Sequence, residues 1–425
     1  MKAPAVSDLT QFDRTIEILE AILRHRRARP TVKSEEVYFE LMIEYYRRIR
    51  DAKANGKLIA AHTVMFPTEI IYAMDMVPMQ LEFAAGTMAR LLDGFEDCFD
   101  VAREFGLTVE TCSPYRALVG AIIKGWLPRP DVVLWSHQVC DNTSKIGIPL
   151  LELLDCPGFY LDQPYRNTSA EFDYYLHEMG ELVAFLEERV GRPMDQDRLR
   201  DAAHQSQKMI DLHREIRELR KAPPGAMLNR QGFQLFLIHW FFRGSPDAVA
   251  FCEVLRDDIR DRAAEKAGLI PEEKLRLLSL FIPSVNKLNI WDWMQTEHGA
   301  NIVMETWLLN WGEGDVDLER PLESISRLSH TAAICRQMHG PVEEGYIPDS
   351  VRDAREFQAD GGIYVAHLGC RQGCAAIRPV RDALMEQASI PTITLAGDMV
   401  DPNFCSDEEL MDALEGFFET LHDRK

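Results

Sequence analysis

Two stretches, DVVLWSHQVC (residues 131–140) and GGIYVAHLGC (residues 361–370), decide the fold of this chain. Each is a short run rich in Val, Ile, Leu and Tyr, bounded by Pro or Gly, and each ends in His-x-x-Cys. Continuous apolar runs of this length are typical of fully buried strands in a parallel sheet. Because ligands of open α/β sheets bind outside the carboxyl ends of the strands, we expect Cys140 and Cys370 to emerge where ligands bind.

Strand-like and helix-like segments alternate around both stretches. Further strands are expected at residues 57–66, 77–83, 158–162, 274–283, 300–306 and 391–398. This alternation predicts an α/β chain with two Rossmann-like parallel-sheet lobes, an N-terminal helical segment and a helical middle region. We place the N-terminal helical segment at 1–54, the first α/β lobe at 55–168, the helical region at 169–270 and the second α/β lobe at 271–425.

Helix signals accompany this division. Helical periodicity runs through residues 8–29 and 35–54, with Ser34 expected as capping residue of the second helix. Pro223-Pro224-Gly225 marks a break in the helical region, and the acidic stretch 311–321 is expected to be a surface loop. A last helix is predicted over 407–422, with Ser406 as its N-cap.

Composition limits the function classes. The 425 residues carry 68 acidic and 47 basic side chains, a net charge of −21, which argues against a nucleic-acid partner. The dense basic run at residues 24–29 is interpreted as a solvated helix end. The most apolar run, residues 235–242, is much shorter than the ~20 residues that cross a bilayer. With no signal-peptide pattern and nine scattered cysteines, we expect a cytoplasmic protein without a membrane partner.

A third cysteine, Cys112 in TVETCSPYRALVG, precedes a helix expected to begin near Pro114. Cys112, Cys140 and Cys370 lie far apart in the sequence, and the last two follow a predicted strand in the same His-x-x-Cys motif. Together these three thiols indicate a metal or cluster site between the lobes. Thiolates select zinc or iron–sulfur clusters, and three protein ligands leave one coordination position open. The residues alone leave the alternative that each is an ordinary buried thiol, because free cysteine is among the most buried residue types.

Other candidates surround these thiols. Zinc bound by His137, Cys140, His367 and Cys370 is a second interpretation, although such histidines also orient neighbouring groups. Glu69 in FPTEIIYAMDMVP opens a helix, where a carboxylate is either stabilised by the helix dipole or a candidate acid/base. No G-x-G-x-x-G, P-loop or G-x-S-x-G motif supports a standard nucleotide fold or a serine hydrolase.

Together these blocks resemble subunits of the 2-hydroxyacyl-CoA dehydratase and benzoyl-CoA reductase family, from about residue 55 to 422. The resemblance is carried by PTEIIYAMDMVP, ETCSPYRALVG, VLWSHQVC, FRGSPDAVAFCEVLRDDI, VAHLGCRQGC and IPTITLAGDMVDPNF, in that order. It places the family's three cluster cysteines on Cys112, Cys140 and Cys370, and its acidic position near the substrate on Glu69.

The resemblance implies a [4Fe–4S] cluster whose fourth iron is open to water or substrate. It also implies a homologous second subunit, or a second copy of the chain, and a separate ATP-hydrolysing iron–sulfur activator that supplies low-potential electrons. One electron on the thioester carbonyl of an acyl-CoA makes a ketyl radical, which expels the α-hydroxyl and acidifies the β-proton. In the reductase branch the same electron delivery attacks an aromatic ring.

Several alternatives stay open within this family. A sister branch carries a double-cubane cluster on additional cysteines, for which Cys98, Cys374 and Cys405 are candidates, and reduces small molecules with ATP. A chain whose cluster only carries electrons is a further alternative. The sequence favours neither a dehydratase nor a ring reductase, although FRGSPDAVAF leans slightly toward the ring-reductase B subunit, and it does not specify the acyl group.

Overall fold

The computed structural model describes residues 2–28, 32–265, 272–306 and 314–424, which form two compact units assembled from discontinuous segments. Unit 1 comprises Met1–Asp211, Ile238–Val254 and Gly312–Ala332, and unit 2 comprises Leu212–Leu237, Leu255–Trp311 and Ala333–Lys425. Each unit contains one four-stranded sheet, and every strand pair described is parallel. The predicted fold class, two parallel-sheet lobes accompanied by helices, is therefore confirmed.

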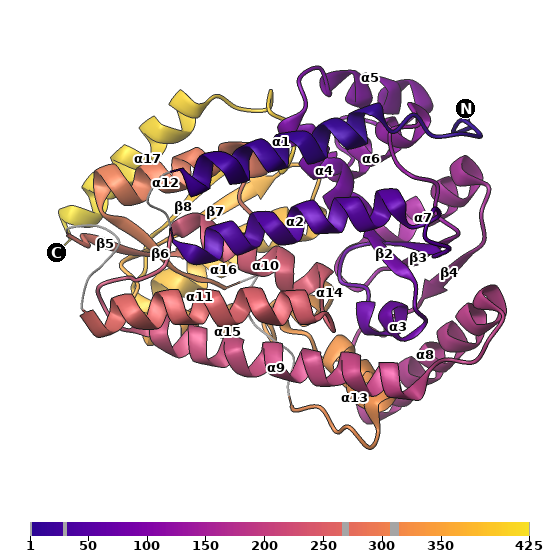
Figure 1. The fold of residues 1–425 in the computed structure, drawn as a ribbon. Helices are drawn as coiled ribbons and strands as arrows, with labels where there is room; N and C mark the ends of the chain where they lie inside the picture. The colour runs from indigo at the N-terminus through magenta and orange to yellow at the C-terminus, as the bar shows by residue number, and fades with distance from the viewer. Residues whose placement is uncertain (1, 29–31, 266–271, 307–313, 425) are drawn as a thin grey trace. The chain divides into compact units, whose positions relative to one another are not determined.

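Unit 1 is built around the first sheet (Figure 1). Its strands are β1 (Ile59–His62), β2 (Val77–Gln80), β3 (Val132–Ser136) and β4 (Gly158–Leu161), in the order β2-β1-β3-β4. Its helices are α1 (Thr10–Arg27), α2 (Lys33–Asp51), α3 (Thr68–Ala73), α4 (Leu81–Leu91), α5 (Glu96–Phe105), α6 (Ser113–Ile123), α7 (Asp141–Leu154), α8 (Ser169–Val190) and α13 (Pro321–His330). The interior β1 and β3 are buried at every position, as their continuous apolar runs predict.

Unit 2 repeats this arrangement with the second set of strands. They are β5 (Leu275–Ser279), β6 (Ala300–Glu305), β7 (Gly361–His367) and β8 (Thr392–Gly397), in the order β6-β5-β7-β8. The accompanying helices are η1 (Val285–Lys287), α12 (Leu288–His298), α14 (Ala333–His339), α15 (Tyr346–Glu356), α16 (Arg371–Ala388) and α17 (Asp407–His422). The two sheets thus have the same strand order, and in both of them the strand that leads to His-x-x-Cys is the third in the chain.

The segment predicted as a helical middle region is helical. After α8 it contains α9 (Gln196–Lys221), α10 (Asn229–Phe241) and α11 (Pro246–Glu265), and each of these three helices contributes residues to both units. The Pro-Pro-Gly break falls between α9 and α10, as predicted. Of the predicted loop 311–321, residues 311–313 lie outside the described part, residues 314–320 form neither helix nor strand, and α13 begins at Pro321.

Two local predictions need correction. The strand expected over 77–83 ends at Gln80, because the Gln80 side chain accepts a hydrogen bond from the backbone N–H of Phe83 and starts α4. The N-cap of α2 is Val32 rather than Ser34, which lies inside the helix and is buried. By contrast, Ser406 caps α17 in a full capping box with Glu409, as the sequence indicated.

The basic run at the end of α1 faces acidic side chains of α2. Arg26 lies 3.2 Å from the buried Glu35, and Arg27 pairs with both Glu36 and Glu40. These arginines are thus partnered within the chain, in line with their interpretation as a helix end. Among the described residues, none of the helices combines the length and the apolar character that a bilayer crossing requires.

Candidate functional site

Cys140 and Cys370 occupy equivalent positions in the two units. Cys140 is the N-cap of α7 after β3, and Cys370 is the N-cap of α16 after β7. Cys112 is also an N-cap, that of α6, with Pro114 in the first turn as predicted. All three proposed ligands therefore precede a helix at the end where unpaired N–H groups and the helix dipole stabilise negative charge.

The sulfur atoms make the contacts that this position predicts. Cys140 Sγ is faced by the backbone N–H groups of Asn142 and Thr143. Burial raises the pKa of the Cys140 thiol, and these N–H groups oppose that effect. In unit 2, the backbone N–H of Gly373 donates to Cys370 Sγ at 3.4 Å. A thiolate bound to a metal would thus be held by backbone donors in both units.

Three side chains continue from Cys140 into the interior of unit 1. Cys140 Sγ lies 3.1 Å from Thr143 Oγ1, and the Tyr115 hydroxyl lies 3.1 Å from the same Thr143 oxygen. The Tyr115 hydroxyl is also 2.6 Å from Glu82 Oε1. The backbone N–H of Tyr115 also donates to the Cys112 carbonyl at the start of α6.

Each unit also pairs the histidine of its His-x-x-Cys motif with an aspartate. His137 Nδ1 lies 3.4 Å from Asp162 Oδ1, directly after β4, and the Tyr160 hydroxyl contacts the same ring nitrogen. His367 Nδ1 lies 3.4 Å from Asp398 Oδ2, directly after β8. An aspartate beside Nδ1 orients an imidazole, which fits the interpretation that these histidines position their surroundings.

Glu69 is a buried member of an ion pair within unit 1. Its Oε1 atom accepts from Arg243 Nε at 3.0 Å and from the Ser206 hydroxyl at 2.8 Å, and the Glu69 side chain is 0% exposed. Gly244 packs against it, since a Cβ atom there would lie 3.0 Å from Glu69 Cγ. Glu69 Oε2 has no hydrogen-bond partner among the described residues, so one carboxylate oxygen is available for another group. The catalytic role of Glu69 stays a prediction.

His62 ends β1 beside β3, at the point where the strand order of unit 1 reverses. Its ring is fully buried, and Nδ1 lies 3.1 Å from the Thr63 carbonyl, so Nδ1 carries the proton and donates. Nε2 has no hydrogen-bond partner in the described part of the chain. Burial lowers the pKa of His62 from 6.5 to about 4. His62 was not among the predicted site residues, although β1, like β7, ends in histidine.

This depressed pKa predicts a pH dependence of stability. Between pH ~6.5 and ~4 the unfolded chain binds a proton at His62 that the folded chain does not, so the free energy of unfolding falls as the pH falls through this range. The full contribution is about 3 kcal/mol. We expect His62→Asn to flatten the pH dependence of the urea midpoint across this window. Identical curves for the wild type and the variant would contradict this expectation.

The remaining cysteines occupy different environments. Cys98 is fully buried in α5 against Gly120 of α6, and burial raises the pKa of its thiol to about 12. Cys374 donates to the His367 carbonyl at 3.3 Å, one helical turn after Cys370. Cys405 lies in the loop before α17 and is partly exposed. Of the candidates for additional cluster ligands, Cys374 and Cys405 thus retain partial exposure, whereas Cys98 is a core thiol.

Within the described residues, no group of three or more His, Cys, Asp or Glu side chains is arranged to hold a metal ion. Cys112 and Cys140 belong to unit 1 and Cys370 to unit 2, so their joint ligand set, and equally the zinc alternative, stays a prediction. The donor chemistry fits an iron–sulfur cluster, because each sulfur is presented at a helix N-cap.

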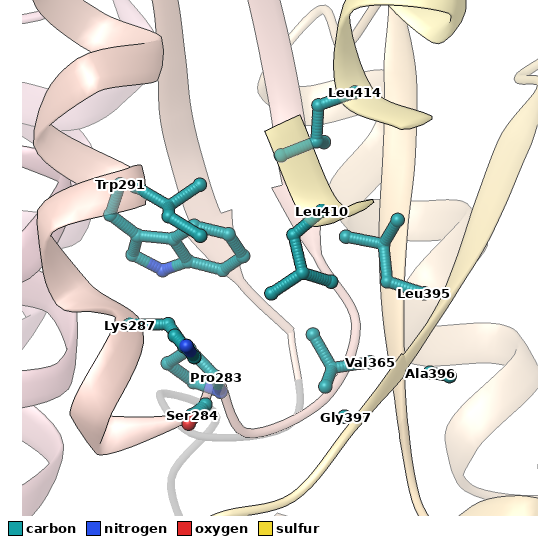
Figure 2. A pocket seen from close by; sticks show the side chains of 11 residues that line it. Pro283, Ser284, Lys287, Trp291, Val365, Leu395, Ala396, Gly397, Leu410 and Leu414 are labelled. Carbon is teal, nitrogen blue, oxygen red and sulfur yellow. The ribbon is translucent and has the colours of Figure 1, made fainter. Parts of the chain in front are cut away.

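Unit 2 contains a small hollow between α12, α17 and the strands β7 and β8. Figure 2 shows the Leu410 side chain between Trp291 and Leu395. Of the residues that line it, Lys287 alone is charged, and its ammonium group pairs with Asp407. None of the proposed ligands lines the hollow, so we do not assign the chemistry to it.

Comparison with known sequences bears directly on this arrangement. Residues 63–421 match the family described as 2-hydroxyglutaryl-CoA dehydratase, D-component. The chain belongs to this family.

Relatives of this D-component family member extend over most of its length. It is 21% identical to the (R)-2-hydroxyisocaproyl-CoA dehydratase alpha subunit of Clostridioides difficile, with 91% of this chain and 95% of the relative covered. It is 24% identical to the B subunit of the benzoyl-CoA reductase of Thauera aromatica, with 91% of this chain and 94% of the relative covered. It is 22% identical to the alpha subunit of the lactoyl-CoA dehydratase of Anaerotignum propionicum, with 88% of this chain and 92% of the relative covered. The predicted resemblance to dehydratase and reductase subunits is thus confirmed.

Proposed function

We propose that this chain is the cluster-bearing subunit of an acyl-CoA dehydratase or acyl-CoA ring reductase, with Cys112, Cys140 and Cys370 as ligands of one [4Fe–4S] cluster. The observation that carries the proposal is the shared N-cap position of the three cysteines, two of which follow equivalent strands of two sheets with the same strand order. When bound, such a cluster supplies single low-potential electrons to the thioester carbonyl of an acyl-CoA.

The residues of the chain then have separate tasks in this proposal. Backbone N–H groups at the N-termini of α7 and α16 face the Cys140 and Cys370 sulfur atoms and would donate to them in the metal-bound state. The available Oε2 atom of Glu69 is the candidate acceptor for a substrate proton, and the hydrogen bond from Arg243 orients this carboxylate. With three thiolate ligands, such a cluster would keep one coordination position for substrate or water.

The names of the relatives support a second subunit. Three of the four matched relatives are alpha subunits of dehydratases, and the fourth is the B subunit of a reductase. We propose that this chain assembles with a homologous subunit, or with a second copy, and receives electrons from an ATP-dependent iron–sulfur activator. Since dehydratase and reductase relatives match at similar identity, the proposal covers the shared chemistry of electron delivery to an acyl-CoA and not one branch.

Anaerobic purification with metal analysis tests this proposal. We expect brown protein with iron and acid-labile sulfide in equal amounts, and a change in the cluster spectrum on adding an acyl-CoA mixture that contains 2-hydroxyacyl and benzoyl thioesters. One zinc ion per chain without sulfide would instead support the zinc enzyme. Iron and sulfide with no spectral response to any acyl-CoA would support a chain that only carries electrons.

A further inference from the structure

The two His-x-x-Cys segments, residues 137–140 and 367–370, differ in the residue that follows the histidine. In unit 1 this residue is Gln138, which is 1% exposed, and in unit 2 it is Leu368, which is 50% exposed. An amide is therefore buried, and an aliphatic side chain is exposed, at equivalent positions after the third strand of each sheet. Because a buried amide costs free energy unless it is hydrogen-bonded, the reason for a glutamine at this position lies in its partners.

The backbone of the two segments differs as well. In unit 2, the backbone N–H of Cys370 donates to the His367 carbonyl at 2.9 Å and closes a turn over residues 367–370. In unit 1, the chain bends at residues 138 and 139 without such a hydrogen bond across the described segment 137–140. The unit 1 segment therefore needs another interaction to fix its path from β3 to the start of α7.

The Gln138 side chain supplies this interaction by joining the segment to three other parts of unit 1. Its Nε2 atom donates to the Tyr175 hydroxyl and to Ser329 Oγ, at 2.8 Å each, and lies 3.2 Å from Gln163 Oε1. Gln163 follows β4, Tyr175 belongs to α8 and Ser329 belongs to α13. All three partners are buried, so these hydrogen bonds are shielded from competing water.

The partners of Gln138 also hold one another in place. Gln163 Nε2 donates to His330 Nδ1 at 2.8 Å, and the His330 ring stacks on the Tyr175 ring with the centroids 5.4 Å apart. The Tyr175 hydroxyl and Ser329 Oγ lie 2.9 Å from each other. We call these four partners, Gln163, Tyr175, Ser329 and His330, the anchor cluster. Gln138 is the residue that connects the anchor cluster to the segment ending in Cys140.

We propose that Gln138 is a positioning residue for the Cys140 sulfur, because its link to the anchor cluster takes the place of the turn hydrogen bond found in unit 2. The link fixes the conformation of residues 137–140, and with it the place of the Cys140 side chain at the N-cap of α7. The inference rests on the proposed function, in which Cys140 is a cluster ligand. It implies that unit 1 holds its ligand segment through side chains, whereas unit 2 holds the equivalent segment through its backbone.

Alkylation kinetics of the metal-free, full-length protein measure how firmly the segment is held. The rate of iodoacetamide labelling is followed at each cysteine by peptide mass spectrometry. Gln138→Leu introduces the residue found in unit 2, and we expect it to raise the labelling rate of Cys140 by about tenfold, because the segment then opens locally. Cys98 is fully buried in the same unit and reports general unfolding, so its rate is expected to stay unchanged.

Two hydroxyl deletions test the same link without changing the segment. The Gln138 amide has two hydrogens for three oxygens, so Tyr175→Phe or Ser329→Ala alone still leaves two acceptors. We expect each single variant to change the Cys140 rate by less than about twofold and the double variant to raise it by about tenfold.

Tyr46→Phe/Ser326→Ala is the matched control for the double variant. It removes two buried hydroxyls of unit 1 that donate to the Ala84 and Leu322 carbonyls, at 2.9 and 2.7 Å. The Cys140 labelling rate of this control is expected to equal that of the wild type. Wild-type Cys140 rates in both Gln138→Leu and the Tyr175→Phe/Ser329→Ala variant would overturn the inference. A rise at Cys98 equal to that at Cys140 would overturn it too, because the cluster would then stabilise unit 1 in general.

The iron-loaded protein separates this inference from the proposed function. We expect Gln138→Leu to release iron to a chelator about tenfold faster than the Tyr46→Phe/Ser326→Ala control, since partners of metal ligands contribute about 10–100-fold to metal affinity. Wild-type protein without iron and sulfide contradicts the proposed function, whatever the labelling rates. Protein that carries both, but whose labelling and iron release are unchanged by Gln138→Leu, contradicts the positioning role alone.

Discussion

Replacing Cys140 by serine is expected to reduce the iron content of anaerobically purified protein by more than about tenfold, because even the loss of an outer-shell partner costs 10–100-fold in metal affinity. The same result is expected for Cys112→Ser and Cys370→Ser. Serine keeps the size and polarity of the side chain at each helix N-cap, so the helices should persist. Iron and sulfide assays, with circular dichroism as a check of the fold, measure the effect.

Two cysteine variants serve as controls for this prediction. Cys156→Ser changes a partly exposed thiol outside the proposed ligand set and is expected to leave the iron content unchanged. Cys374→Ser separates the branches of the family: unchanged iron supports a single cluster, and loss of half the iron supports the double-cubane alternative. Full iron content in Cys140→Ser would contradict the ligand assignment.

Breaking the Glu69–Arg243 pair is expected to have the largest effect on stability. Both side chains are nearly inaccessible, with 0% and 6% exposure, so Arg243→Met would leave a buried carboxylate without its cation. Removing one partner of a buried ion pair costs about 3–5 kcal/mol. We expect a clear fall in the urea midpoint of Arg243→Met, and partial recovery in the double variant Glu69→Gln/Arg243→Met, in which no unpaired charge remains.

An exposed ion pair offers the matched control. Arg378 and Asp382 lie 3.4 Å apart on α16 with 91% and 59% exposure, so Arg378→Met is expected to cost less than about 1 kcal/mol. If Arg243→Met unfolds at the same urea concentration as Arg378→Met, the pair is not buried as described. If the double variant recovers stability and still does not turn over acyl-CoA, the result supports the proton-acceptor role of Glu69.

The fold could be predicted from the sequence because the patterns that indicate its strands and helices are local. The apolar runs that lead to Cys140 and Cys370 predicted β3 and β7, and the capping pattern at Ser406 predicted the start of α17. The error at residues 77–83 has a local cause as well. Leu81 and Phe83 extend the apolar pattern of β2, but the Gln80 side chain caps a helix there, and periodicity does not detect that interaction.

The contacts that join Cys140, Thr143, Tyr115 and Glu82 could not be predicted from the sequence, because they connect distant residues. Tyr115 is 33 residues from Glu82 and 28 from Thr143, and neither separation is visible as a pattern. One signal was present. Tyr115 and Thr143 each stand three residues after a proposed ligand cysteine, on the first turn of the helix that the cysteine caps. A side-chain hydroxyl at that spacing can reach the residue that caps the helix. The three-residue spacing could therefore have indicated both Tyr115 and Thr143 as candidate neighbours of the site.

Mössbauer spectroscopy of the ⁵⁷Fe-loaded, full-length protein, with and without acyl-CoA, tests the central claim most directly. Three cysteine ligands predict one iron in each cluster that differs from the other three, and whose parameters change when a 2-hydroxyacyl or benzoyl thioester is added. Four equivalent irons that do not respond to either thioester would mean a cluster with four protein ligands and no open position. That result would contradict the account.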